Sequence, residues 1–139
     1  MSPTLCLNMI VKNESRIIKR LLESVYNIID IYCICDTGST DNTIDIITSF
    51  FEEKNIPGKI ISEPFKNFEY NRTISLQSCV GMSDYVLLLD ADMILKVCNF
   101  NKELLTGIDA GYIYQTNNRL IYKNVRIVKN NGLFNFSEI

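Results

Sequence analysis

The sequence predicts an α/β fold built around a mostly parallel β-sheet. Short apolar runs alternate along the chain with segments whose apolar residues recur at helical spacing. Clusters of Gly, Pro, Asn, Asp and Ser separate these segments. Residues 85–89 are apolar throughout, which is typical of a strand buried on both faces. Because strands and helices alternate, we expect parallel strands joined by helical crossovers, in one domain of 139 residues.

The elements follow in order from local signals. The patterns predict strands at residues 4–11, 31–35, 59–62 and 85–89, and helices after residue 13, after residues 40–41 and at residues 67–79. Asn13 is the expected N-cap of the first helix, since its side chain can accept from a free backbone N–H. The apolar positions of that helix, from Glu14 onward, are Ile17, Ile18, Leu21, Leu22, Val25 and Ile29.

The loop at residues 36–41 is rich in turn-forming residues. Thr40 or Asp41 is expected to cap the second helix, which ends before Pro57-Gly58. After residue 92 the pattern changes to shorter strands, linked by Asn-rich turns. These are expected at residues 111–116, 120–128 and 132–136. The sequence therefore predicts a short antiparallel C-terminal annex beside the parallel part of a mixed sheet.

Composition limits the function classes. The net charge is −2 and no basic run occurs, so there is no electrostatic case for a nucleic-acid partner. No apolar run approaches the ~20 residues of a membrane span, and no signal-peptide pattern opens the chain. Five irregularly spaced cysteines indicate reduced thiols and a cytoplasmic location. The chain has no His and no Cys-x-x-Cys, which argues against a zinc site, and the lack of His removes the His-activated nucleophiles.

Acidic residues follow two of the expected strands directly. Asp90 and Asp92 come after the apolar run, and Asp36 ends the second strand. Ligands of open α/β sheets bind at the carboxyl ends of the strands, and carboxylate oxygens suit Mg²⁺ or Mn²⁺, which hold phosphates. Neither a G-x-G-x-x-G nor a P-loop motif is present. A metal at Asp92 would instead neutralise a nucleotide diphosphate, with Asp36 accepting from a uracil N–H and Arg72 pairing with base or phosphate oxygens.

Three segments resemble glycosyltransferase family 2 in sequence, order and spacing. They are residues 8–14 (NMIVKNE), residues 36–43 (DTGSTDNT) and residues 90–92 (DAD). The nearest branch is typified by bacterial lipopolysaccharide-core glucosyltransferases, and residues 67–72 (NFEYNR) are similar to a segment of that branch ending in Ala-Arg-Asn. Thr73 stands where that branch has the Asn. The resemblance covers residues 5–95 well and the rest thinly.

The resemblance implies a single Rossmann-like A-type glycosyltransferase domain over residues 1–139, with a donor-binding part at 1–95 and a partial acceptor-side annex at 96–139. It implies transfer of a hexose from a UDP-sugar, with inversion, to an unknown glycan, lipid or protein acceptor. Mn²⁺ or Mg²⁺ would act as a Lewis acid on the leaving UDP. The implied nucleotide-sugar-binding residues are Met9, Val11, Glu14, Asp36, Arg72, Asp90, Ala91 and Asp92. Of these, Asp92 and Asp90 form the implied metal site, and Asp90 would also contact ribose or sugar.

The general base is the part that the sequence does not supply. In the family it is a carboxylate from the acceptor-binding half, near a His-Glu pair. Residues 124–134 resemble the stretch leading to that pair, and the chain ends about where the pair would follow. We therefore expect mainly the donor-binding half here, with Glu138 as a weak candidate for the base. Homodimerisation stays open.

Alternative interpretations remain at this level. The chain could be a silent module that binds UDP or a UDP-sugar, or a sugar nucleotidyltransferase, although the Gly-rich loop of the latter is absent. Asp41 is expected to be a structural cap, and Glu14 and Arg72 have purely structural readings as well. Arg126 is expected to point outward from its strand.

Overall fold

A mixed six-stranded sheet forms the centre of the computed structural model, which describes residues 2–97, 100–116 and 121–133. The strand order is β3-β2-β1-β4-β6-β5. The strands are β1 (Leu5–Val11), β2 (Ile31–Asp36), β3 (Gly58–Ser62), β4 (Tyr85–Leu88), β5 (Ala110–Thr116) and β6 (Ile121–Lys129). The helices are α1 (Ile18–Val25), α2 (Thr43–Glu53), α3 (Phe68–Ser78) and the short 3₁₀ helix η1 (Lys102–Leu105).

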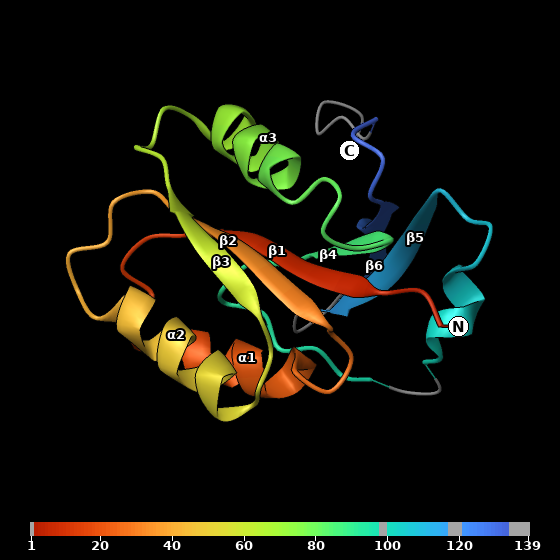
Figure 1. The fold of residues 1–139 in the computed structure, drawn as a ribbon, viewed down its shortest axis with the longest axis horizontal. Coiled ribbons are helices and arrows are strands. Elements are labelled where there is room, and N and C mark those ends of the chain that lie inside the picture. Colours follow the sequence, from red (N-terminus) through yellow and green to blue (C-terminus); the bar gives the residue numbers. More distant parts are fainter. Residues whose placement is uncertain (1, 98–99, 117–120, 134–139) are drawn as a thin grey trace.

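The parallel and antiparallel parts lie where the sequence predicts them. β1 pairs in parallel with β2 and β4, and β2 pairs in parallel with β3. β6 runs antiparallel to both β4 and β5. Helices α1 and α2 cover one face of the sheet and α3 covers the other (Figure 1). The predicted α/β class with a mixed, mostly parallel sheet and an antiparallel annex is confirmed.

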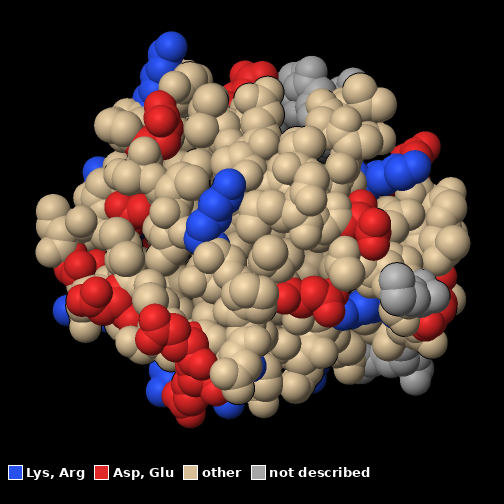
Figure 2. Space-filling model, in the orientation of Figure 1, with Lys and Arg blue, Asp and Glu red and all other residues tan. Residues whose placement is uncertain are grey.

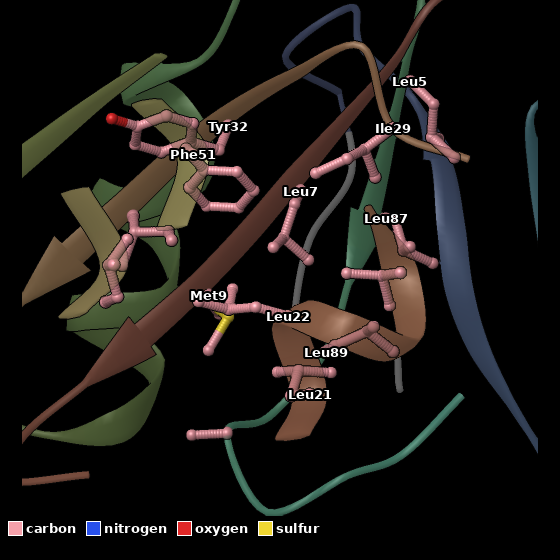
Figure 3. Close-up of a cluster of buried hydrophobic side chains, with 14 of the residues drawn as sticks. Leu5, Leu7, Met9, Leu21, Leu22, Ile29, Tyr32, Phe51, Leu87 and Leu89 are labelled. Atoms are coloured by element: carbon pink, nitrogen blue, oxygen red, sulfur yellow. The ribbon is translucent and has the colours of Figure 1, made fainter. Parts of the chain in front are cut away.

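The main core lies between the sheet and helices α1 and α2 (Figure 3). Alternate residues of β1 point into it, and they meet the apolar stripe of α1. Phe51 of α2 is fully buried, and its ring stacks on Tyr32 of β2 with 4.2 Å between centroids. The side chains of β1 and β4 are buried on both faces of the sheet. This explains why neither strand alternates regularly between apolar and polar residues.

A polar contact fixes α3 to the opposite face of the sheet. Asn8 of β1 is buried, and its side-chain amide donates to the carbonyl oxygens of Cys33 (3.0 Å) and Ser75 (2.9 Å). The Ser75 hydroxyl donates back to Asn8 Oδ1 at 3.2 Å. Buried amides need such partners, because each unsatisfied group costs free energy. The pair therefore sets where α3 lies over β1.

Several element boundaries differ from the sequence expectations. Helix α1 begins at Ile18 instead of Glu14, because residues 15–17 form a turn. Asn13 has a positive φ of 51° and does not cap α1; its side chain binds the following β2–α2 loop instead. Ile29 is buried beyond the end of α1. Gly132 and Leu133 are not in a strand, and the rest of the expected strand at 132–136 lies outside the described residues.

On the face shown in Figure 2, Lys and Arg side chains are scattered singly and form no continuous basic surface. No helix in the described part of the chain is both long and apolar enough to cross a membrane.

Candidate functional site

A polar groove lies at the carboxyl ends of β1, β2 and β4. It consists of two adjoining hollows of about 300 and 340 Å³. Ile10, Glu14 and Phe68 line both hollows, so the two are continuous. The remaining lining residues of the first hollow are Arg72, Asp90, Ala91 and Asp92; those of the second are Val11, Lys12, Thr37 and Phe65. The groove therefore lies at the carboxyl ends of the strands, where open α/β sheets bind their ligands.

The two loops that border the groove are joined by side-chain hydrogen bonds. Asn13 Oδ1 accepts from the backbone N–H groups of Thr40 (2.7 Å) and Asp41 (3.3 Å). In return, the N–H of Glu14 donates to Thr43 Oγ1 at 2.8 Å. Asp41 accepts from both the hydroxyl and the N–H of Thr43, just inside α2, and these hydrogen bonds lower the pKa of Asp41 to about 2. The prediction that Thr40 or Asp41 caps α2 is wrong, because the N-cap position is Asn42, whose side chain makes no capping hydrogen bond. The network of contacts between the two loops nevertheless fixes Glu14 beside the groove.

The two carboxylate oxygens of Asp36 have different surroundings: one stabilises the following turn, and the other accepts no hydrogen bond from the described residues. The side chain is 3% exposed, and Oδ2 accepts from the N–H groups of Gly38 (3.1 Å) and Ser39 (3.0 Å). Oδ1 is buried and has no hydrogen-bond partner among the described residues. Buried carboxylate oxygens normally have a partner, so Oδ1 is an acceptor in need of a donor. Asp36 immediately precedes Thr37, which lines the groove.

Asp90 lies between two arginines. Arg72 of α3 donates to Asp90 Oδ1 at 3.2 Å, and Nη1 of Arg126 lies 3.8 Å from Oδ2. The Asp90 side chain is one-third exposed, whereas that of Arg126 is only 16% exposed. These contacts join α3, the end of β4 and β6 around one carboxylate, and they balance its charge within the protein.

The prediction that Arg126 points outward is wrong. β5 and β6 carry a register shift at this point: Gly111 pairs with Ile127, and Tyr112 pairs with Val125, so Arg126 lies at the shift. A bulge of this kind redirects the side chain of the extra residue, and bulges are common beside active sites.

Acidic side chains dominate the hollow of about 300 Å³, which Glu14, Asp90 and Asp92 line. Partial burial, followed by the charges of Asp92, Asp41 and Asp90, raises the pKa of Glu14 above its usual value. Asp92 is exposed, and within the described residues it has no ion pair. No group of three or more acidic or cysteine side chains forms a ready metal cage in the described ranges. The donor set fits a hard cation that takes one or two carboxylates and completes its coordination with phosphates and water.

Most of the residues expected from the sequence line this groove. Val11, Glu14, Arg72, Asp90, Ala91 and Asp92 line it directly. The Met9 side chain instead packs in the core and is 3% exposed. Glu138 lies outside the described residues. The sequence reasoning did not single out Lys12, Thr37, Phe65 or Phe68 as site residues; their proximity to the expected motifs was the available signal.

Comparison with known proteins places this chain among the glycosyltransferases. Residues 6–130 match the family described as Glycosyl transferase family 2. The chain belongs to glycosyltransferase family 2. An uncharacterized glycosyltransferase of Rickettsia felis is 32% identical over 110 residues, covering 79% of this chain and 34% of that protein. The SPbeta prophage-derived glycosyltransferase SunS of Bacillus subtilis is 35% identical over 92 residues, covering 66% of this chain and 20% of SunS.

Solved structures show the same fold. The structure of S. aureus TarS 1–349 in complex with UDP matches with a TM-score of 0.56 and 20% identity, over 73% of this chain and 30% of that one. The mannosyltransferase PcManGT from Pyrobaculum calidifontis, in complex with GDP-Man and Mn²⁺, matches with a TM-score of 0.59 and 17% identity, over 70% and 30%. The chain spans about a third or less of the length of these relatives.

Proposed function

We propose that this chain binds a UDP-sugar and a divalent cation in the groove, as the donor-binding part of a glycosyltransferase that transfers a hexose with inversion. The observation that carries the proposal is the groove itself. It brings Glu14, Asp90 and Asp92 to one end, while Thr37, next to the buried acceptor of Asp36, lines the other. One end suits a cation and phosphates, and the other suits a base with an N–H donor.

Charge explains why the proposal includes a metal. Glu14, Asp90 and Asp92 line the hollow of about 300 Å³, and partial burial, followed by the charges of its acidic neighbours, raises the pKa of Glu14. Arg72 and Arg126 are engaged by Asp90. A diphosphate would therefore be repelled by a negatively charged surface, and a bound divalent cation would turn that repulsion into attraction. We assign the cation to Asp92, with Mn²⁺ or Mg²⁺ supplying Lewis-acid stabilisation of the leaving diphosphate when bound.

The chain's own residues would then divide the work of binding. Arg72 presents a fork of donors at the groove wall, suited to phosphate oxygens, and Asp90 is held at the same wall for a ribose or sugar hydroxyl. Asp36 Oδ1 would accept from the imide N–H of uracil. Structures of TarS with UDP and of PcManGT with GDP-Man and Mn²⁺ support a nucleotide-sugar and metal site on this fold. The acceptor, a glycan, lipid or protein, would approach from outside these residues.

The division into a donor-binding part at 1–95 and an acceptor-side annex at 96–139, and the likeness to the lipopolysaccharide-core branch, stay predictions. A cytoplasmic location is also part of the proposal. It is supported by Cys6, Cys33, Cys35 and Cys79, which are all free and buried.

Calorimetric titration of UDP into the purified protein tests the proposal. We expect binding with Mn²⁺ present and little or none in EDTA. A folded sample that binds no UDP under either condition would overturn the donor assignment. Incubation with UDP-hexoses and candidate acceptors then separates the two readings of a positive result, because binding without any transfer identifies a UDP-binding module.

Asp36→Asn tests the base contact separately. The amide can keep its oxygen on the N–H groups of Gly38 and Ser39, but then presents N–H₂ where Oδ1 now lies, so a donor on the base would be repelled. We expect uridine and UDP affinities to fall by about tenfold, the scale of a lost charge-assisted hydrogen bond, with pyrophosphate affinity unchanged.

Asp84→Asn is the matched control. Asp84 also accepts from a backbone N–H, that of Thr4, but it precedes β4 at the opposite end of that strand. Its substitution should leave all three ligand affinities unchanged. Equal losses of UDP and pyrophosphate affinity in Asp36→Asn would argue against a base contact.

A further inference from the structure

Two phenylalanine rings lie exposed on the wall of the groove. Phe68, the first residue of α3, is 61% exposed, and Phe65, in the loop before it, is 46% exposed. The rings meet edge to face with 5.1 Å between centroids and 74° between planes. Both line the hollow of about 340 Å³ that faces the ends of β1 and β2. Keeping large apolar side chains exposed to water costs free energy, so two together at a groove call for an explanation.

The backbone that carries these rings is held in place. Asn71 is fully buried, and its amide donates to the carbonyl oxygens of Glu63 and Pro64 while its Oδ1 accepts from the N–H of Lys66 at 2.9 Å. Asn67 caps α3 by accepting from the N–H of Tyr70 at 2.7 Å. These contacts close the β3–α3 loop around its own side chains, so the ring pair is presented by a fixed segment.

The opposite wall of the same hollow carries no ring. Ile10, Val11, Lys12 and Glu14 come from β1 and the loop after it, and Thr37 comes from the end of β2. A flat molecule in this hollow would have aliphatic and polar atoms on one side and an aromatic face on the other. Thr37 also brings that molecule next to Asp36, whose Oδ1 lacks a donor.

Arg72 connects this hollow to the acidic one. Its guanidinium carbon lies 5.3 Å from the centroid of the Phe68 ring, while its Nη2 donates to Asp90. Phe68 lines both hollows. A ligand with a planar ring at one end and negative phosphates at the other could therefore place its ring on Phe68 and its phosphates near the guanidinium of Arg72, along one wall of the groove.

We propose that Phe68, in edge-to-face contact with Phe65, forms a stacking surface for the nucleobase of the donor. The inference rests on the proposed function and deepens it, because it assigns base affinity to the start of α3 as well as to the end of β2. Stacking on an aromatic side chain uses the face of the base and tolerates its identity. Asp36 would instead contact the edge of the base. Stacking on Phe68 would therefore supply affinity, and the hydrogen bond to Asp36 would supply selectivity.

Titrations of three Phe68 variants test the stacking surface, with UDP, uridine and pyrophosphate as ligands in Mn²⁺. Phe68→Ala should weaken UDP and uridine by about tenfold, within the range found when a stacking ring is removed, and leave pyrophosphate unchanged. Phe68→Leu should weaken both nearly as much, since it keeps apolar bulk without a ring. Phe68→Trp should retain or improve wild-type affinity. Leu104→Ala removes a comparably exposed apolar side chain of η1, away from the groove, and should change nothing.

The outcomes separate this inference from the proposed function. If the wild-type protein binds no UDP, the proposed function fails and this inference fails with it. If the wild type binds UDP and Phe68→Ala binds it equally well, only the stacking surface is overturned. Equal losses of UDP and pyrophosphate would show that Phe68 acts by holding Arg72, which also overturns it. Full affinity in Phe68→Leu would replace stacking by simple apolar contact.

Discussion

Asp92→Ala is expected to remove the metal-dependent part of UDP binding while the protein stays folded. The side chain is exposed and lies just after β4, so its truncation leaves no cavity. With Mn²⁺ present, UDP affinity should fall by at least about tenfold, to the level measured in EDTA, because the carboxylate that holds the cation is gone. Calorimetry with and without EDTA measures the affinity, and circular dichroism measures the fold.

Asp109→Ala is the matched control for this experiment. Asp109 is also an exposed aspartate in a loop, but it precedes β5 and does not line the groove. Its removal changes the net charge equally and should leave UDP binding intact. If Asp92→Ala keeps a full Mn²⁺ response, the cation is held elsewhere and the assignment of Asp92 is wrong.

Phe51→Ala is expected to have the largest effect on stability. The ring is fully buried in the main core and stacks on Tyr32 with 13° between the planes (Figure 3). Its loss removes apolar burial and leaves a cavity beneath β2, so the free energy of unfolding should fall by about 3–5 kcal/mol. Urea titration followed by circular dichroism measures that difference.

Exposed apolar residues provide the contrast. Leu104→Ala removes a side chain that is 67% exposed, and its effect should stay within about 0.5 kcal/mol. A loss below about 1 kcal/mol in Phe51→Ala would mean that the core closes around the gap or that the stacked pair contributes little.

The parallel part of the fold was predictable because its signals are local. Apolar runs and helical stripes define β1, α1, β2, α2, β3, α3 and β4 within a few residues of their observed bounds. The start of α1 was wrong because Asn13 serves a contact 27 residues away, with Thr40, instead of its own helix. Local patterns cannot reveal which distant loop claims a polar side chain.

The candidate site was predictable for the residues that directly follow strands. Asp36, Asp90 and Asp92 stand where β2 and β4 end, and the carboxyl edge of the sheet brings such residues together. Arg126 was missed because its direction depends on a bulge in the pairing of β5 with β6. Phe65 and Phe68 were missed because phenylalanine in a sequence indicates a core position, and only the structure shows their exposure.

The position of β6 between β4 and β5 has a consequence for how the chain folds during synthesis. Residues up to the end of β4 can form four parallel strands as they emerge, but the outer edge of β4 then has no partner strand. An open apolar edge is a template for wrong pairing with other chains. It is covered only when residues 127–129 are made and pair with β4, and Arg126 reaches Asp90 at the same moment. Pairing of β6 with β4 therefore protects the edge of the parallel strands and brings Arg126 to Asp90 in a single step.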